Sequence, residues 1–270
     1  MLQGIDVSLY EPEVDWPRVV ASGKVNFVFV RAGQGIVPDS SFWTHWIGAR
    51  NASLPRGAYW VYDPRYRTVE PQRQAEKFIE TLNGDYGELP LVADIEAYTS
   101  GPHHGWKKWA DFLEYTKRLL PENFKARWSD FEPMIVYTGY YYWRDQGGPA
   151  WWDVNAQKYF AKHLLWLAYY GTGDGDLNNT PQKAKLLPLH KWLEWTFWQY
   201  ADHLTMDGIT NELGKSTNVD LNVFVGERDA FNEMFKLSAL PPPPPPPPPK
   251  TLAARVTVLE TQAQAHGWSI

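Results

Sequence analysis

The chain has 270 residues, a net charge of −5 and no cysteine. This acidic balance argues against a nucleic-acid partner, because such proteins usually present a basic face, and the lack of cysteine excludes disulfides, thiolate metal sites and cysteine nucleophiles. No stretch reaches the roughly 18–20 apolar residues that a membrane span requires, so we expect no membrane span.

The predicted strands are eight short apolar runs rich in Val, Ile, Tyr and Trp. Several are continuous rather than alternating, as expected for strands buried on both faces of a parallel sheet. They cover residues 3–9, 25–32, 56–62, 89–96, 133–139, 164–170, 195–200 and 219–224. Helices are predicted between them at 71–82, which opens on a proline, and at 107–120, which Pro121 ends. This alternation predicts either a β/α barrel or an open doubly wound sheet.

Aromatic residues make up 16 % of the chain, with 15 tryptophans and 15 tyrosines. Most of them are expected in the core. Trp and Tyr also supply flat faces on which sugar rings stack, with polar edges that hydrogen-bond to hydroxyl groups. The composition therefore leaves room for a surface that handles carbohydrate.

A long polar segment, residues 171–191, follows the sixth predicted strand. Asp174, Asp176 and Asn178 resemble the start of a calcium-binding loop. Such a loop has glycine at its sixth position and glutamate at its twelfth, whereas this chain has Asn179 and Lys185 there. We therefore predict a polar loop.

Nine consecutive prolines at 241–249 predict an extended polyproline II rod and a domain boundary. We expect a folded domain over 1–238, a linker over 239–250 and a short C-terminal segment over 251–270. That segment has apolar residues at heptad-like spacing, namely Leu252, Val256, Leu259 and Ala263. It is predicted to be a short amphipathic helix that forms a homo-oligomer through residues 251–265, a helix that docks onto the main domain, or a disordered tail.

Two acids close the fourth predicted strand, in the run LVADIEAY. Residues two apart on a strand point to the same face, so Asp94 and Glu96 are expected to project together, about 6.6–7 Å apart. Asp6 in GIDVS and Asp220 in NVDLN occupy comparable places on two other strands. Four carboxylates on one rim would raise at least one pKa, as cleavage of a glycosidic bond requires. The alternatives are turn or cap residues, a metal site, or an ion pair with Arg31.

The motifs GIDVSLYEPEVDW, DIE, WTFWQYAD and VDLNVF occur in this order along the chain. Over roughly residues 1–235 the chain thereby resembles glycoside hydrolase family 25, the Chalaropsis-type lysozymes of bacterial and phage origin. The resemblance implies an irregular β/α barrel of about eight mostly parallel strands, followed here by the polyproline linker. It also implies hydrolysis of the β-1,4 bond between N-acetylmuramic acid and N-acetylglucosamine in bacterial peptidoglycan, without a cofactor or metal.

The resemblance also implies roles for the four acids. Glu96 matches the general acid that protonates the glycosidic oxygen and then activates water. Asp94 matches the neighbouring carboxylate, which orients the 2-acetamido group of the substrate, and Asp6 and Asp220 match the two remaining acids. The strand spacing lies near the lower bound for inverting enzymes, whereas the resemblance favours retention through the acetamido oxygen of the substrate.

Four aromatic residues complete the predicted site. By the resemblance, Tyr59 and Tyr137 match positions that line the substrate groove. Trp166 and Trp198 are either sugar-contact residues or core residues.

Three features depart from the family pattern. Trp60 stands where a histidine often follows the tyrosine of the third strand, and the run RAGQG at 31–35 replaces a common K-A-S/T-E-G. The segment 171–191 is long and is expected to shape one wall of the groove. None of these changes touches the four acids, so we expect them to affect the shape of the substrate groove.

The residues present argue against two other functions. A non-catalytic peptidoglycan-binding barrel would be marked by loss of Glu96, which is present, and a chitinase of the D-x-x-D-x-D-x-E type would need acids where Leu89 and Val92 stand. His103 and His104 receive no role, because no cluster has metal-ligand spacing. The N-terminus lacks a secretory signal. We therefore expect a phage endolysin made in the host cytoplasm or a trimmed secreted enzyme, acting on the bacterial cell wall.

Overall fold

The computed structural model describes residues 1–65, 70–96, 106–128, 130–146, 153–171, 175–211 and 213–237. By its internal contacts the chain divides into two units, Met1–Leu240 and Pro241–Ile270. The predicted linker and C-terminal helix lie outside the described residues, as does the pair of histidines at 103 and 104. Their structure therefore stays a prediction.

The described part of the chain alternates strands and helices. Its strands are β1 (Leu2–Val7), β2 (Glu13–Val14), β3 (Val28–Gln34), β4 (Val37–Pro38), β5 (Arg56–Val61), β6 (Leu91–Asp94), β7 (Met134–Gly139), β8 (Leu164–Ala168), β9 (Phe197–Thr210) and β10 (Ser216–Phe224). Its helices are α1 (Trp16–Ala21), α2 (Phe42–Asn51), α3 (Pro71–Leu82), α4 (Lys107–Leu119), α5 (Glu122–Lys125), η1 (Ala126–Trp128), η2 (Tyr142–Gln146), α7 (Val154–Phe160) and α8 (Arg228–Met234).

Eight of the strands close into a barrel. Six adjacent pairs are parallel, in the order β1, β3, β5, β6, β7, β8 and β9. The last strand, β10, closes the wall and runs antiparallel to both β9 and β1. The predicted irregular, mostly parallel barrel is confirmed, and the open sheet that the strand spacing alone allowed is excluded.

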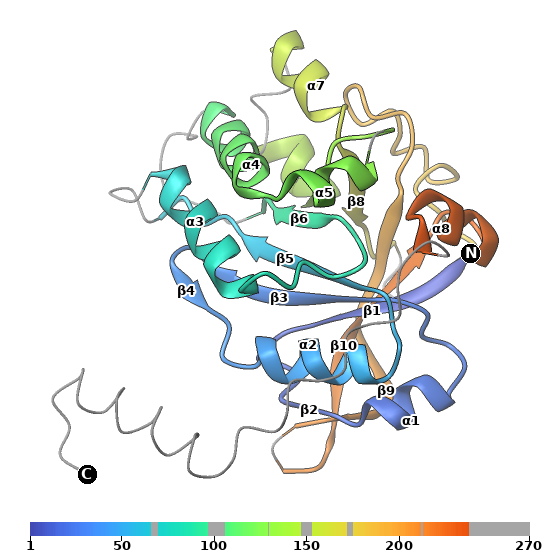
Figure 1. The fold of residues 1–270 in the computed structure, drawn as a ribbon. Helices are drawn as coiled ribbons and strands as arrows, with labels where there is room; N and C mark the ends of the chain where they lie inside the picture. The colour runs from blue at the N-terminus through green and yellow to red at the C-terminus, as the bar shows by residue number, and fades with distance from the viewer. Residues whose placement is uncertain are drawn as a thin grey trace, which may run out of the picture. The chain divides into compact units, whose positions relative to one another are not determined.

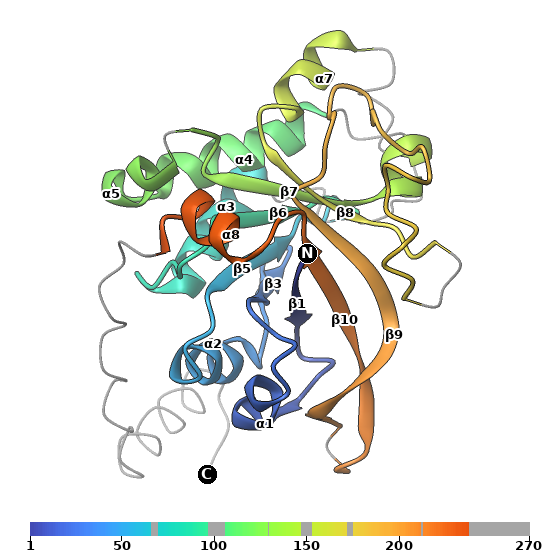
Figure 2. The ribbon, with the colours of Figure 1, turned by 90° about the vertical axis from the view of Figure 1, so that its right-hand side faces the viewer.

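The strands β9 and β10 are longer than predicted. They were expected at 195–200 and 219–224, but they pair as one long antiparallel ribbon from Phe197 to Phe224, which Figure 2 shows. The error for β9 comes from its burial pattern, because residues 203–207 alternate between exposed and half-buried. A search for continuous apolar runs misses such a segment.

The helices α3 and α4 lie side by side on the outside of the wall (Figure 1). The predicted helix at 71–82 is confirmed, and it ends at Asn83, whose φ of 46° is left-handed. The helix predicted at 107–120 is also confirmed, one residue shorter. The helices α1, α5, α7 and α8 were not predicted, because four to seven residues are too few to show a helical period. The ten-residue helix α2 was not predicted either.

Aromatic rings fill the barrel beneath its C-terminal end. The ring of Phe29 stacks on Trp166 with 4.4 Å between centroids, and Phe197 meets Phe29 edge-on at 5.1 Å. All three side chains are buried. They close the interior from below, so that an opening can form only at the rim above them.

No helix in the described ranges is long and apolar enough to cross a membrane.

Candidate active site

A cavity of about 600 Å³ opens at the C-terminal ends of the strands, above the ring of Trp166. Most of its lining side chains can hydrogen-bond or carry charge. They are Asp6, Ser8, Tyr10, Glu11, Arg31, Gln34, Tyr59, Val61, Arg65, Asp94, Glu96, Tyr137, Trp166, Gln199 and Asp220. A site of this composition is built to hold a polar molecule.

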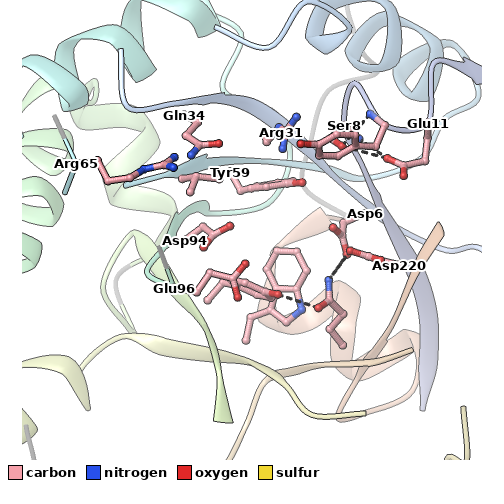
Figure 3. Close-up of a pocket in the computed structure, with 15 residues that line it drawn as sticks. Asp6, Ser8, Glu11, Arg31, Gln34, Tyr59, Arg65, Asp94, Glu96 and Asp220 are labelled. Atoms are coloured by element: carbon pink, nitrogen blue, oxygen red, sulfur yellow. Dashed lines mark hydrogen bonds between the residues drawn. The ribbon is translucent and has the colours of Figure 1, made fainter. Parts of the chain in front are cut away.

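The cavity brings together the four acids predicted from the sequence, Asp6, Asp94, Glu96 and Asp220. Figure 3 shows Asp94 and Glu96 on one side of it and Asp6 with Asp220 on the other. Three of the predicted aromatic residues line the same space, namely Tyr59, Tyr137 and Trp166.

Strand register explains how the acids meet. Asp94 is the last residue of β6, and Glu96 follows two positions later. Asp6 on β1 and Asp220 on β10 are direct partners in the antiparallel ladder. In the closed wall, β6 lies three strands from β1 and four from β10, so the two pairs of acids face each other across the mouth.

Trp198 does not line the cavity. Its neighbour Gln199 does, and successive residues on a strand point to opposite faces. The indole of Trp198 is 1 % exposed and donates a hydrogen bond to the carbonyl oxygen of Tyr169 at 2.7 Å. Of the two interpretations of this residue, its burial fits a core position.

The segment 171–191 was expected to shape a wall of the groove, yet none of its described residues lines the cavity. Its residue Leu189 forms a short bridge with Trp192, whose indole donates to the carbonyl of His163 at 2.9 Å. The part of the segment that the structure describes therefore gives no support to that expectation, since loop length says nothing about the direction in which a loop folds.

Gln199 joins the two halves of the site. Its Nε2 donates to Asp6 Oδ2 at 2.9 Å and to Asp220 Oδ2 at 3.1 Å. Its Oε1 accepts hydrogen bonds from the hydroxyls of Tyr137 at 2.8 Å and Tyr170 at 2.7 Å. The amide thereby links both acids on one side to two tyrosines on the other.

A second amide holds Asp6 from below. Asn222 Nδ2 donates to Asp6 Oδ2 at 2.7 Å, while its Oδ1 accepts from the indole of Trp166 at 2.8 Å. With Gln199, this gives one oxygen of Asp6 two amide donors, which fixes the orientation of the carboxyl group.

Burial dominates the electrostatics of the acids. It raises the pKa of Glu96 to about 7, and the charge of Asp6 adds to that effect. Burial also raises the pKa of Asp6 to about 6, against two amide hydrogen bonds that lower it. Burial and the nearby charge of Asp6 raise the pKa of Asp220 to about 9.

Asp94 has surroundings that disfavour its ionised form. Burial, then the charges of Glu96 and Asp6, raise the pKa of this carboxyl well above its usual range. Its Oδ1 is buried and accepts no hydrogen bond in the described structure. Near neutral pH, the site therefore holds protonated and ionised carboxyl groups side by side, which is the combination that general acid catalysis requires.

Glu11 and Arg31 also line the cavity, although the sequence analysis gave neither a role in catalysis. Glu11 Oε2 accepts from the Ser8 amide at 2.9 Å and hydroxyl at 3.2 Å, and burial raises the pKa of Glu11 to about 7. Arg31 Nε pairs with Asp39 Oδ2 at 2.7 Å. Asp39 is thus the carboxylate that Arg31 pairs with, rather than Asp94 or Glu96.

The polar character of Gln199 was the one available signal for that residue, because it interrupts the apolar run WTFWQY. Its partners could not be foreseen, since β1 and β10 supply them from distant parts of the chain. Among the described residues, no group of three or more histidines, aspartates and glutamates is arranged to hold a metal ion.

Comparison with known proteins gives three related findings. The family model described as "Glycosyl hydrolases family 25" matches residues 5–209. "Lysozyme M1" of Streptomyces globisporus is 29 % identical over 233 residues, covering 83 % of this chain and 68 % of that protein. "Uncharacterized protein YegX" of Escherichia coli K12 is 26 % identical over 230 residues, covering 83 % of this chain and 70 % of that protein.

A solved structure agrees on the fold. The bacterial lysozyme from Streptomyces coelicolor superposes with a TM-score of 0.65 at 24 % identity, covering 88 % of this chain and 98 % of the other. At this identity the likeness concerns the fold.

Proposed function

The chain belongs to glycosyl hydrolases family 25, a family of peptidoglycan-hydrolysing lysozymes that act on bacterial cell walls, and we propose that it cleaves one particular bond of that polymer. The bond is the β-1,4 linkage between N-acetylmuramic acid and N-acetylglucosamine. The observation that carries the proposal is the position of Glu96, in a cavity where its pKa is raised to about 7.

Glu96 acts as the general acid. Below pH 7 its carboxyl group is largely protonated, and it donates that proton to the glycosidic oxygen as the bond to the anomeric carbon breaks. The ionised Glu96 then takes a proton from water, whose oxygen bonds to the anomeric carbon and displaces the acetamido oxygen of the substrate, and the acid is regenerated.

Asp94 orients the 2-acetamido group of the substrate. In this mechanism the acetamido oxygen bonds to the anomeric carbon while the leaving oxygen departs, and water then displaces the acetamido oxygen. Two successive inversions retain the configuration without a protein nucleophile. In its ionised form, Asp94 accepts a hydrogen bond from the acetamido N–H, which strengthens the attacking oxygen and offsets the positive charge that develops. Two observations support this role: Asp94 lines the cavity, and its Oδ1 has no hydrogen-bond partner in the described structure.

Asp6, whose pKa is raised only to about 6, supplies negative potential on the opposite side of the mouth near neutral pH. Asp220, whose pKa is raised to about 9, stays neutral there and positions the substrate, and Gln199 holds both side chains in place. Tyr59 and Tyr137 line the groove, and Trp166 forms its floor. These residues position the sugar that carries the anomeric carbon.

The experiment is digestion of purified peptidoglycan, followed by borohydride reduction and mass spectrometry of the new chain ends. Reduced muramic acid ends are expected with the wild-type protein. Glu96→Gln keeps the size of the side chain and removes the acid, so it should lower the rate at least about 100-fold. Glu76→Gln is the matched control, because Glu76 is an exposed residue of α3 paired with Arg73, and it should keep the wild-type rate.

Three results would contradict the proposal. Reduced glucosamine ends would mean that the other glycosidic bond is cut. A wild-type rate for Glu96→Gln would remove Glu96 as the acid. No new ends, together with retention of the protein on the cell wall, would show a binding module instead.

A further inference from the structure

Three tyrosines and an arginine gather one step outside the cavity. The rings of Tyr140 and Tyr141 lie 5.1 Å apart, and Tyr169 lies 6.0 Å from the first and 6.3 Å from the second. The guanidinium of Arg144 covers the ring of Tyr141 at 5.0 Å. We call these four residues the tyrosine platform.

The platform adjoins the proposed general acid. Gly139 and Ala168 end β7 and β8 as direct partners, and Tyr140 and Tyr169 are the next residues along each strand. A Cβ placed on Gly139 would lie 3.9 Å from Glu96 Oε2. Tyr140 of the platform therefore directly follows Gly139, the residue that lies beside Glu96.

Core packing does not account for the whole platform. Tyr140 and Tyr169 are half-buried and pack against the core, whereas Tyr141 has 57 % of its surface exposed. Its ring is held by Arg144, which also forms an ion pair with Asp145. A ring that is fixed in place and open to solvent is a surface ready for stacking.

The opposite rim of the mouth has a similar arrangement. A second cavity of about 270 Å³ lies there and shares Tyr10, Arg31, Gln34 and Arg65 with the lining of the first. The guanidinium of Arg31 covers the ring of Tyr10 at 4.9 Å. Tyr10 follows β1 and Tyr141 follows β7, and these strands lie four places apart in the wall of eight.

We propose that the tyrosine platform binds a sugar unit of the glycan strand being cut, outside the sugars at the acids. The strand then crosses the mouth from the platform, past Glu96, to the second cavity beside Tyr10. The inference rests on the proposed function, because it takes peptidoglycan glycan as the substrate. The open face of Tyr141 stacks on a pyranose ring, and Arg144 offers donors to its hydroxyl groups.

The test compares two soluble substrates, long peptide-free glycan strands and a tetrasaccharide with the same repeat. The measured quantity is the ratio of kcat/KM for the strand to that for the tetrasaccharide. Tyr141→Ala should lower this ratio about tenfold, the size of one good aromatic contact. Tyr141→Trp keeps an aromatic face and should restore most of it, which a purely structural role would not predict.

Arg144→Ala should lower the ratio in the same direction, and it serves as a second variant if Tyr141→Ala is poorly folded. Arg118→Ala is its matched control, because Arg118 covers the ring of Tyr115 at the same 5.0 Å, three residues apart, on α4. It should leave the ratio unchanged.

An unchanged ratio in both platform variants would overturn the inference while leaving the proposed function intact. So would an equal loss on both substrates, since that would place the effect at the acids rather than beyond them. If the wild-type protein cleaves neither substrate, the proposed function fails, and the platform inference fails with it.

Discussion

At the scale of single residues, the site holds buried carboxyl groups whose charges repel one another. Asp94 is 4 % exposed, near Asp6 and Glu96, and lacks a hydrogen-bond partner for one oxygen. A buried acid whose pKa is raised favours the folded state only while it is protonated. Its contribution is therefore present below its ordinary pKa of 3.8 and is lost as the pH rises through the raised value.

Asp94→Asn should consequently stabilise the fold at pH 8 and change little at pH 4. The amide resembles the protonated acid, so it relieves the conflict only where the wild-type carboxyl would ionise. We expect a gain of about 0.5–2 kcal/mol in the free energy of unfolding at pH 8, the range typical of a relieved site, together with a loss of activity. Urea unfolding at the two pH values measures it.

Glu194→Gln is the control, because Glu194 is an exposed acid in the loop before β9, and it should shift stability equally at both pH values. A loss of stability in Asp94→Asn at pH 8 would show that the ionised carboxylate stabilises the fold.

At the scale of elements, β1 closes the barrel against strands from both ends of the domain. It pairs with β3 on one side and β10 on the other. Gly4 in its middle faces Phe27, and a Cβ there would lie 2.5 Å from the ring. Phe27 is in turn held by Phe29, Phe197 and Phe231.

Gly4→Ala should therefore destabilise the barrel by about 1–3 kcal/mol, the usual cost of adding a methyl group to a packed core. Gln3→Ala changes the neighbouring residue, which points to the opposite face of β1, and should stay within about 0.5 kcal/mol of the wild type. Thermal unfolding of both variants gives the comparison. Equal melting temperatures would mean that Phe27 moves aside freely.

The elements also show what the sequence could predict. Strands with continuous apolar runs and the helix α3, with its proline start and strong amphipathic period, were found from pattern alone. Closure of the wall was not, because the pairing of β1 with β10 joins residues more than 200 positions apart. For the same reason the roles of Gln199 and Asn222 could not be predicted, because the acids to which their side chains donate hydrogen bonds lie on other strands.

The sequence pattern also could not predict which aromatic side chains point into the barrel. Trp166 and Trp198 lie in similar apolar runs, yet only the first points into the barrel. The phase of β9 is set by Gln199, whose partners become apparent only once the strands are paired.

At the scale of the whole molecule, the chain divides at Leu240, ahead of the nine prolines. All the pairings that close the barrel lie within residues 2–224. We therefore propose that the catalytic domain, expected at 1–238, folds without the rest of the chain.

Truncation after Leu240 should give a soluble protein with the melting temperature of the full chain and its activity on soluble glycan strands. Light scattering on both forms tests one of the three alternatives for the C-terminal segment at the same time. If residues 251–265 form a homo-oligomer, their removal should leave a monomer. An insoluble or inactive fragment would show that the C-terminal segment completes the fold.

The direct pairing of Asp6 with Asp220 has a consequence for the order of events during synthesis. Asp6 lies on the first strand of the barrel, but its partner strand is the last strand of the barrel to emerge from the ribosome. Until then β1 lacks its β10 neighbour, and Asp220 cannot lie beside Asp6. We therefore expect a nascent chain to lack an assembled site until nearly the whole domain has been made, and to acquire it in a single late step.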